Sequence, residues 1–180
     1  MKKTMVLFVL LPFSFFFSQT ETSKHSFVGV QTCGTCHKTE KQGMQLDIWQ
    51  KSKHSQAFKT LQTEKANTIA KEKGFTTPAA ETEACLKCHV SGFNVDASML
   101  GEKFKMEDGV QCETCHGAGS DYKTLKIMKS HEESVANGMT EIKDVETFCK
   151  TCHNSESPSF KEVDMKAEWT KIAHPVPEKK

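Results

Sequence analysis

The sequence predicts a mainly α-helical protein built from short helices and long loops, with little β structure. Three segments carry apolar residues at helical spacing, and no stretch alternates apolar and polar residues over more than four positions, as a strand would. The chain beyond residue 18 has the length of one ordinary domain. We therefore expect helices at 40–52, 56–73 and 121–137, the last two ending before Gly74 and Gly138, and a loop at 92–108.

The N-terminal segment has the three-part pattern of a secretory signal peptide. Lys2 and Lys3 precede an apolar run at 5–17, and polar residues follow from Ser18. This run is too short for a bilayer, which needs ~20 helical residues, so an uncleaved membrane anchor is the weaker interpretation. We expect a cleaved signal peptide at 1–18 and a single domain at 19–180, periplasmic or otherwise extracytoplasmic, with no transmembrane span in the mature chain.

The charge of the chain argues against nucleic acid as a partner. Without Lys2 and Lys3 the 24 basic residues become 22, against 23 acidic ones, so the mature chain is close to neutral. The chain has no arginine and no basic run of the kind that binds phosphate backbones.

All eight cysteines lie in four C-x-x-C-H motifs. This spacing is typical of c-type haem attachment, because two thiols one helical turn apart reach the two vinyl groups of one porphyrin, and the next imidazole lies beneath the iron. The sequence therefore predicts four covalently bound haem c groups, with the cysteines as attachment sites and the histidines as proximal ligands. Motif one is Cys33, Cys36 and His37, motif two is Cys85, Cys88 and His89, motif three is Cys112, Cys115 and His116, and motif four is Cys149, Cys152 and His153.

Three other uses of cysteine explain this pattern less well. Disulfides are common in exported proteins but do not require a histidine after each cysteine pair. Zinc sites use C-x-x-C pairs without needing that histidine either. A thioredoxin-like redox motif would occur once, beside an alternating strand and helix pattern that this sequence lacks.

Four haems in one small domain must lie close together. They leave about 40 residues for each haem, which is too few for four separate haem domains. The apolar fraction of 37% includes the signal peptide, so side chains alone make a poor core. We expect helices and loops wrapped around four closely packed haems that either conduct or store electrons. The haem propionates would make the holoprotein anionic and favour partners with basic patches.

Histidines outside the motifs are candidates for the sixth iron position, because neutral imidazole is a good iron ligand. They are His25, His54, His131 and His174. Methionine is the other usual axial ligand, although methionines also fill gaps in cores. The methionines available for either role are Met44, Met99, Met106, Met128, Met139 and Met165.

Three segments near the motifs resemble the tetrahaem cytochrome c-554 family. Residues 49–57 read W-x-x-S-x-H-x-x-A, residues 90–93 read V-S-G-F, and residues 109–119 read G-V-Q-C-E-T-C-H-G-A-G. Gln111 and Ala118 stand where the family often has glycine and proline. The family is known from ammonia oxidation, where a member accepts electrons from hydroxylamine oxidoreductase. The resemblance therefore implies electron transfer in a respiratory or nitrogen-oxide-linked chain.

The resemblance also implies a set of distal ligands. His131 would complete the first haem, His174 the third and His54 the fourth, whereas the second haem, above His89, would keep an open iron. His25 is either a distal ligand of that second haem or a surface histidine.

These observations favour an electron carrier between a redox protein donor and a redox protein acceptor. An iron with both axial positions filled has no place for a substrate. The alternative is a small-molecule redox enzyme that uses nitric oxide or hydroxylamine at an open second haem, although the chain has no arginine to fix an anion there. A third interpretation is a subunit of a larger cytochrome complex or of a membrane-associated assembly.

Overall fold

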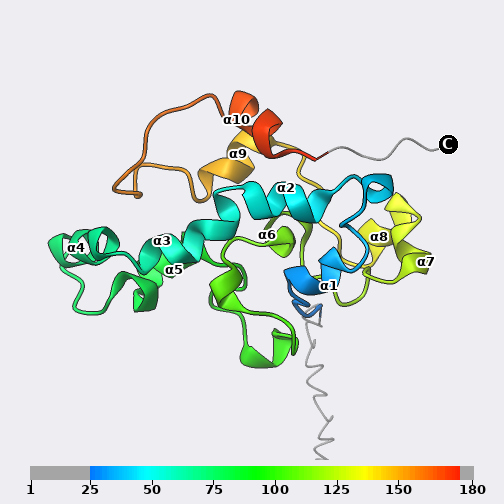
Figure 1. Ribbon diagram of the computed structural model, residues 1–180, viewed down its shortest axis with the longest axis horizontal. Coiled ribbons are helices and arrows are strands. Elements are labelled where there is room, and N and C mark those ends of the chain that lie inside the picture. Colours follow the sequence, from blue (N-terminus) through cyan, green and yellow to red (C-terminus); the bar gives the residue numbers. More distant parts are fainter. Residues whose placement is uncertain (1–24, 175–180) are drawn as a thin grey trace, which may run out of the picture.

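The computed structural model describes residues 25–174, so the expected signal peptide lies outside the described residues. The described chain is mainly α-helical (Figure 1), which confirms the predicted fold class. Its β structure amounts to one isolated parallel bridge between Phe27 and Leu100 within these residues.

The helices are short, and the α-helices span four to nine residues each. The α-helices are α1 Val30–Gly34, α2 Gln45–Lys51, α3 Ala57–Leu61, α4 Glu64–Glu72, α5 Glu83–His89, α6 Cys112–His116, α7 Leu125–Met128, α8 His131–Ala136, α9 Val145–Lys150 and α10 Met165–Ile172. Turns of 3-10 helix lie between them: η1 Glu40–Gln42, η2 His54–Gln56, η3 Ala79–Glu81, η4 Ala97–Met99 and η5 Met106–Asp108.

The helices are arranged along the long axis of the molecule (Figure 1). One end is formed by α3, α4 and α5, and the other by the contacting pair α7 and α8. Helices α1, α2 and α6 lie between these ends, and α9 packs against α10. The four attachment motifs are therefore distributed over the middle and one end of the fold.

The helix expected at 40–52 is interrupted in its first half. Gly43 and Met44 both have left-handed backbone conformations, with φ of 92° and 53°. This reversal ends η1 and lets α2 begin in a new direction, so the periodic apolar residues Ile48 and Trp49 are helical but the earlier residues form a separate turn.

The helices expected at 56–73 and 121–137 are each divided in two by a capping residue. The Thr63 hydroxyl accepts the N–H of Ala66 and starts α4 anew after α3. The Ser130 hydroxyl accepts the N–H of Glu133 in the same way and separates α7 from α8. Hydroxyl side chains favour helix N-termini over helix interiors, which explains why the longer predicted helices are wrong at these points.

The predicted helix end at Gly74 is confirmed. Gly74 has a φ of 86°. Its N–H donates to the carbonyl of Lys71, and the next N–H, of Phe75, donates to the carbonyl of Ala70. This is the Schellman arrangement that closes many helices. The stretch 92–108 is a loop with two 3-10 turns, as expected, and its Phe104 packs edge-to-face on Phe27 with ring centroids 5.6 Å apart.

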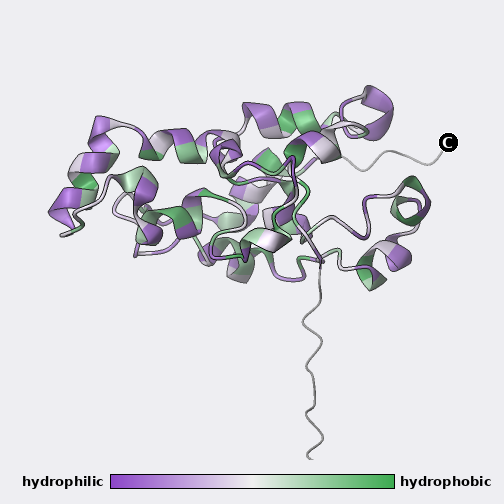
Figure 2. Ribbon diagram, turned by 90° about the horizontal axis from the view of Figure 1, so that it is seen from below, coloured by the Kyte–Doolittle hydropathy of each residue, from purple (hydrophilic) through white to green (hydrophobic). Residues whose placement is uncertain are grey.

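The apolar core among the described residues is small for a domain of this size. Hydrophobic and hydrophilic residues are mixed along most of the helices (Figure 2). Few apolar side chains are buried, and three of them form one cluster with α4 and α5 at an end of the molecule: Leu61, Ala70 and Ala79. The other buried apolar side chains are Val28, Val30, Val90, Tyr122 and Met165. A domain with so little buried apolar surface needs another source of stability.

Candidate functional site

Each attachment motif lies on a helical turn. Motif one begins in α1, motif two ends α5, motif three makes up α6, and motif four begins at the end of α9. In motifs one and four the N–H of His37 and His153 donates to the carbonyl of the first cysteine, at 3.1 and 2.9 Å. This helical geometry places the two cysteines of a motif one turn apart, as covalent attachment to a single porphyrin requires.

The motifs meet one another through their cysteines. Cys33 of motif one shares a side-chain hydrogen bond with Cys112 of motif three. Cys88 of motif two makes the corresponding contact with Cys152 of motif four. Cys115 of motif three also lies near motif four. Groups attached at these motifs would therefore be close neighbours.

Three of the motif thiols, those of Cys33, Cys88 and Cys115, are poor nucleophiles in the folded chain. Burial, together with nearby Cys152, raises the pKa of Cys88 to about 11. Burial, with Cys149 and Cys152 nearby, also raises the pKa of Cys115 to about 11. The contact with Cys112 and burial raise the pKa of Cys33 as well. Because the thiolate is the reactive form, covalent attachment is easier before the chain has fully folded around these thiols.

Two of the proximal histidines each face a histidine from outside the motifs. The rings of His54 and His153 have centroids 6.0 Å apart and planes inclined by 72°. The rings of His116 and His174 have centroids 5.8 Å apart and planes inclined by 29°. An iron bonded to one nitrogen of each ring at about 2.0–2.1 Å, the usual distance between a metal and an imidazole, would hold two such centroids roughly 6 Å apart. The centroid separations of both pairs are therefore compatible with an iron between the rings.

The electrostatics of these rings also suit metal binding. Burial lowers the pKa of His54, and nearby His153 adds to the effect. Burial is likewise the main cause of the lowered pKa of His116 and of His174. These three imidazoles are consequently neutral at pH 7, which is the form that binds a metal.

A cavity of about 590 Å³ lies beside motif three. Its volume falls within the ~300–1,000 Å³ range of small-molecule and cofactor sites. It is lined by both cysteines and the histidine of that motif and by His174 on α10's C-terminal side. The donor set and the volume therefore both fit a haem. Apolar and aromatic side chains complete its wall: Ile48, Trp49, Val110, Met139, Ile142, Trp169 and Ile172.

The segment that carries His54 is fixed to the residues just before motif three. The Trp49 indole N–H donates to the carbonyl of Val110 at 2.8 Å, and the Val110 N–H donates to the carbonyl of His54 at 3.0 Å. Gly109 packs so closely that an added Cβ would lie 2.8 Å from that same His54 oxygen. The position of the His54 ring therefore depends on the backbone that leads into motif three.

Gly109→Ala is expected to destabilise the holoprotein by about 3 kcal/mol or more, because it combines left-handed backbone strain with a backbone clash. Gly74→Ala is the matched control, since Gly74 also has positive φ but its added Cβ would meet nothing within 4 Å. The control should cost only the strain, about 1–2 kcal/mol. Urea unfolding, followed by haem absorption, measures the free energy of unfolding of both variants. Equal losses of that free energy would show that the contact with the His54 carbonyl is unimportant.

His89 of motif two is oriented by a backbone contact. Its Nδ1–H donates to the carbonyl of Ala57 at 2.8 Å, which leaves Nε2 as the free ring nitrogen. A second-shell bond of this kind fixes the ring and makes it a better metal ligand. Ala57 follows His54 by one helical turn, so one short segment orients His89 and carries His54.

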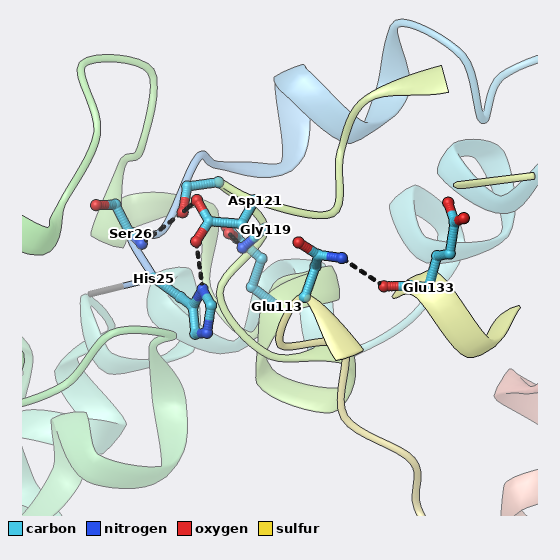
Figure 3. Close-up of polar contacts among 8 residues, drawn as sticks. His25, Ser26, Glu113, Gly119, Asp121 and Glu133 are labelled. Atoms are coloured by element: carbon cyan, nitrogen blue, oxygen red, sulfur yellow. Dashed lines mark hydrogen bonds and ion pairs between the residues drawn. The ribbon is translucent and has the colours of Figure 1, made fainter. Parts of the chain in front are cut away.

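His131 and His25 have carboxylate partners. His131 Nε2 lies 3.3 Å from Glu141 Oε1, and its side chain is 69% exposed at the rim of the cavity beside motif three. His25 Nδ1 lies 2.6 Å from Asp121 Oδ2 (Figure 3), and the His25 ring packs against Gly138. Neither ring faces a second histidine ring in the described part of the chain.

Two polar residues at motif three, Glu113 and Gln111, are buried, and the sequence does not predict their burial. The Glu113 carboxylate accepts backbone N–H groups from Val28, Gly29 and Gly119, each at 2.8 Å (Figure 3 draws the Gly119 contact). The Gln111 Oε1 accepts the N–H of Val30 at 2.8 Å. Both side chains are 2% exposed, so they fasten the segment that leads into motif one onto motif three. No sequence signal distinguishes them from exposed polar residues.

Tyr122, the single tyrosine of the sequence, contacts the backbone at the end of motif three. Its hydroxyl donates toward the carbonyls of His116 and Gly117, at 3.0 and 2.8 Å. Burial raises its pKa. Tyr122 thus fixes the backbone at the end of motif three and stays protonated at neutral pH.

Attachment motifs on helical turns, with neutral imidazoles facing two of the proximal histidines, are the features of a c-type cytochrome. Comparison with known proteins narrows this class. Residues 32–117, which contain motifs one to three, match the family model described as cytochrome c554 and c-prime. The chain is also 29% identical to cytochrome c-554 of Nitrosomonas europaea over 149 residues, which cover 75% of this chain and 61% of the relative. Both matches support the cytochrome c-554 family for this chain, and a c-type cytochrome implies covalently bound haem c.

No solved structure matches the chain significantly. Between residues 25 and 174, no helix has the length and apolar character needed to span a membrane.

Proposed function

We propose that this protein is an exported electron carrier with four covalently bound haem c groups. The observation that carries the proposal is the pairing of His54 with His153 and of His116 with His174, at centroid separations of 6.0 and 5.8 Å. When bound, haem supplies reversible one-electron chemistry at its iron. The protein's contribution is to attach, orient and enclose that group.

The cysteines and the proximal histidines would hold the four groups at motifs one to four. Among the distal residues, His54 would bind opposite His153, and His174 opposite His116, because each of these pairs already faces across an iron-sized gap. His131 remains the distal residue proposed for motif one on the family resemblance. The iron at motif two, beside His89, remains the proposed open site, with His25 as the alternative ligand.

Axial pairs of neutral histidine favour a carrier over an enzyme. Two imidazoles hold an iron with little change of geometry between oxidation states and leave no position for a substrate. The contacts between motifs further support a carrier, because they would bring all four groups into one connected set. An enzymatic role would have to rest on the haem beside His89 alone.

The proposed location and partners follow from the sequence. A cleaved signal peptide at 1–18 would export the chain, and c-type attachment is consistent with an extracytoplasmic protein. The nearly neutral polypeptide would become anionic with its haem propionates, so donor and acceptor proteins with basic docking surfaces are favoured. A place in a membrane-associated or larger cytochrome complex is compatible with this charge.

A spectroelectrochemical titration of the purified holoprotein tests the proposed function. We expect four reversible one-electron steps and rapid exchange of electrons with a small soluble cytochrome that carries a basic docking surface. Fewer than four steps would overturn the haem count. Four steps without exchange with any protein partner, combined with steady turnover of nitric oxide or hydroxylamine, would favour the enzyme instead.

A further inference from the structure

Glu113 is a buried carboxylate without a cationic partner in the part of the chain that the structure describes. Its side chain is 2% exposed. Oε1 accepts N–H groups from Val28 and Gly119, and Oε2 accepts the N–H of Gly29, all at 2.8 Å. Both oxygens act only as acceptors, which is the bonding pattern of a carboxylate ion and not of a carboxylic acid. The site therefore holds a negative charge solvated by backbone dipoles.

This charge lies between two attachment motifs. Glu113 directly follows Cys112 in motif three, and the N–H groups of Val28 and Gly29 come from the segment that leads into motif one. Cys33 and Cys112 contact each other, and the charge of Glu113 acts on both thiols. Groups attached at motifs one and three would thus share one buried negative charge.

The surroundings of motifs two and four differ. One carboxylate near motif two, that of Glu156, is 68% exposed and forms an ion pair with Lys87. Near motif four, Glu146 is 51% exposed and lies 2.6 Å from Lys150. Exposed, paired charges are screened by solvent and largely cancel at a distance, whereas a buried unpaired charge is screened much less.

We propose that the Glu113 carboxylate lowers the reduction potentials of the haems at motifs one and three. This inference rests on the proposed function, since it requires haem at both motifs. A ferric centre carries one more positive charge than a ferrous centre, so a nearby buried anion stabilises the oxidised state. The protein would thereby hold electrons preferentially at motifs two and four.

The test compares holoproteins of wild type, Glu113→Gln, Glu113→Asp and Glu146→Gln by redox titration with NMR assignment of each haem. Glu113→Gln removes the charge and nearly preserves the shape, although its amide would face the N–H of Gly29. Glu113→Asp keeps the charge and disturbs the hydrogen bonds. Glu146→Gln removes an exposed carboxylate close to motif four.

In Glu113→Gln we expect the equilibrium constants for one-electron reduction of the haems at motifs one and three to be about tenfold larger than in wild type. This corresponds to a rise of about 59 mV in the reduction potential of each of these haems. The other two potentials should stay unchanged, and Glu113→Asp and Glu146→Gln should resemble wild type. Unchanged potentials in Glu113→Gln, or equal shifts in Glu113→Gln and Glu113→Asp, would overturn the role of the charge.

The wild-type holoprotein supplies a second test if the Gln variant does not mature. The haems at motifs one and three should then have the two lowest potentials, and any other order contradicts the proposal. Haem content of the same samples separates this inference from the proposed function. Four reversible haems without the expected order refute only the role of Glu113, whereas fewer than four haems refute the proposed function.

Discussion

Without attached haem, the chain is expected to lose its cooperative fold. The described residues bury few apolar side chains, and the cluster of Leu61, Ala70 and Ala79 lies at one end of the molecule. Ordering the backbone costs about 1–2 kcal/mol per residue, which so small a core cannot offset. The lining of the cavity beside motif three, rich in apolar side chains, would also face water.

The measurement is urea unfolding followed by circular dichroism on a chain in which serine replaces all eight motif cysteines. We expect a low helical signal and no sigmoidal transition, against a cooperative transition in the holoprotein. A variant with only Cys149 and Cys152 replaced is the control for cysteine loss itself, and it should retain a weakened transition. A fully cooperative transition in the chain without haem would mean that side chains alone maintain the fold.

Replacing either proposed distal histidine is expected to convert one low-spin haem in four to the high-spin state. His54→Ala removes the ring that faces His153, and His174→Ala removes the ring that faces His116. Each change would free one iron position, and His37, which lies near His116 and His174, is itself the proximal ligand proposed for motif one. Low-temperature electron paramagnetic resonance of the oxidised protein measures the gain of high-spin ferric signal.

His25→Ala is the matched control for these variants, because its ring is bound to Asp121 and packs on Gly138. It should leave the spin states unchanged. The wild-type spectrum itself should contain one high-spin haem, assigned to motif two. Four low-spin haems in the wild type and three in His25→Ala would contradict the proposed open iron at motif two. That result would identify His25 as the distal ligand of that iron.

The sequence predicts the local geometry of the four motifs better than the contacts between distant segments. The C-x-x-C-H spacing is a local signal, since one helical turn determines which atoms reach a porphyrin, and the structure places all four motifs on such turns. The pairing of His54 with His153 joins residues far apart in the chain. Only the family resemblance suggested it, because spacing alone cannot bring distant segments together.

Helix lengths and the supporting residues were harder to predict. Apolar periodicity continues across Thr63 and Ser130, but each hydroxyl caps the next helix and so divides the predicted one. Glu113 lies within motif three and Gln111 lies directly before it. Most polar residues at such positions would face solvent. Their burial depends on the N-terminal segment that folds back to donate its N–H groups, and this long-range contact leaves no pattern in the sequence.

The most direct test of the central claim is the intact mass of the exported holoprotein, measured under denaturing conditions that retain only covalent groups. Four haem attachment motifs predict a mass equal to that of the polypeptide from residue 19 onward plus four haems. A chain carrying three haems or fewer, or one whose cysteines are joined as disulfides, would contradict the account. Peptide mapping of the same sample would then show which motif lacks its haem.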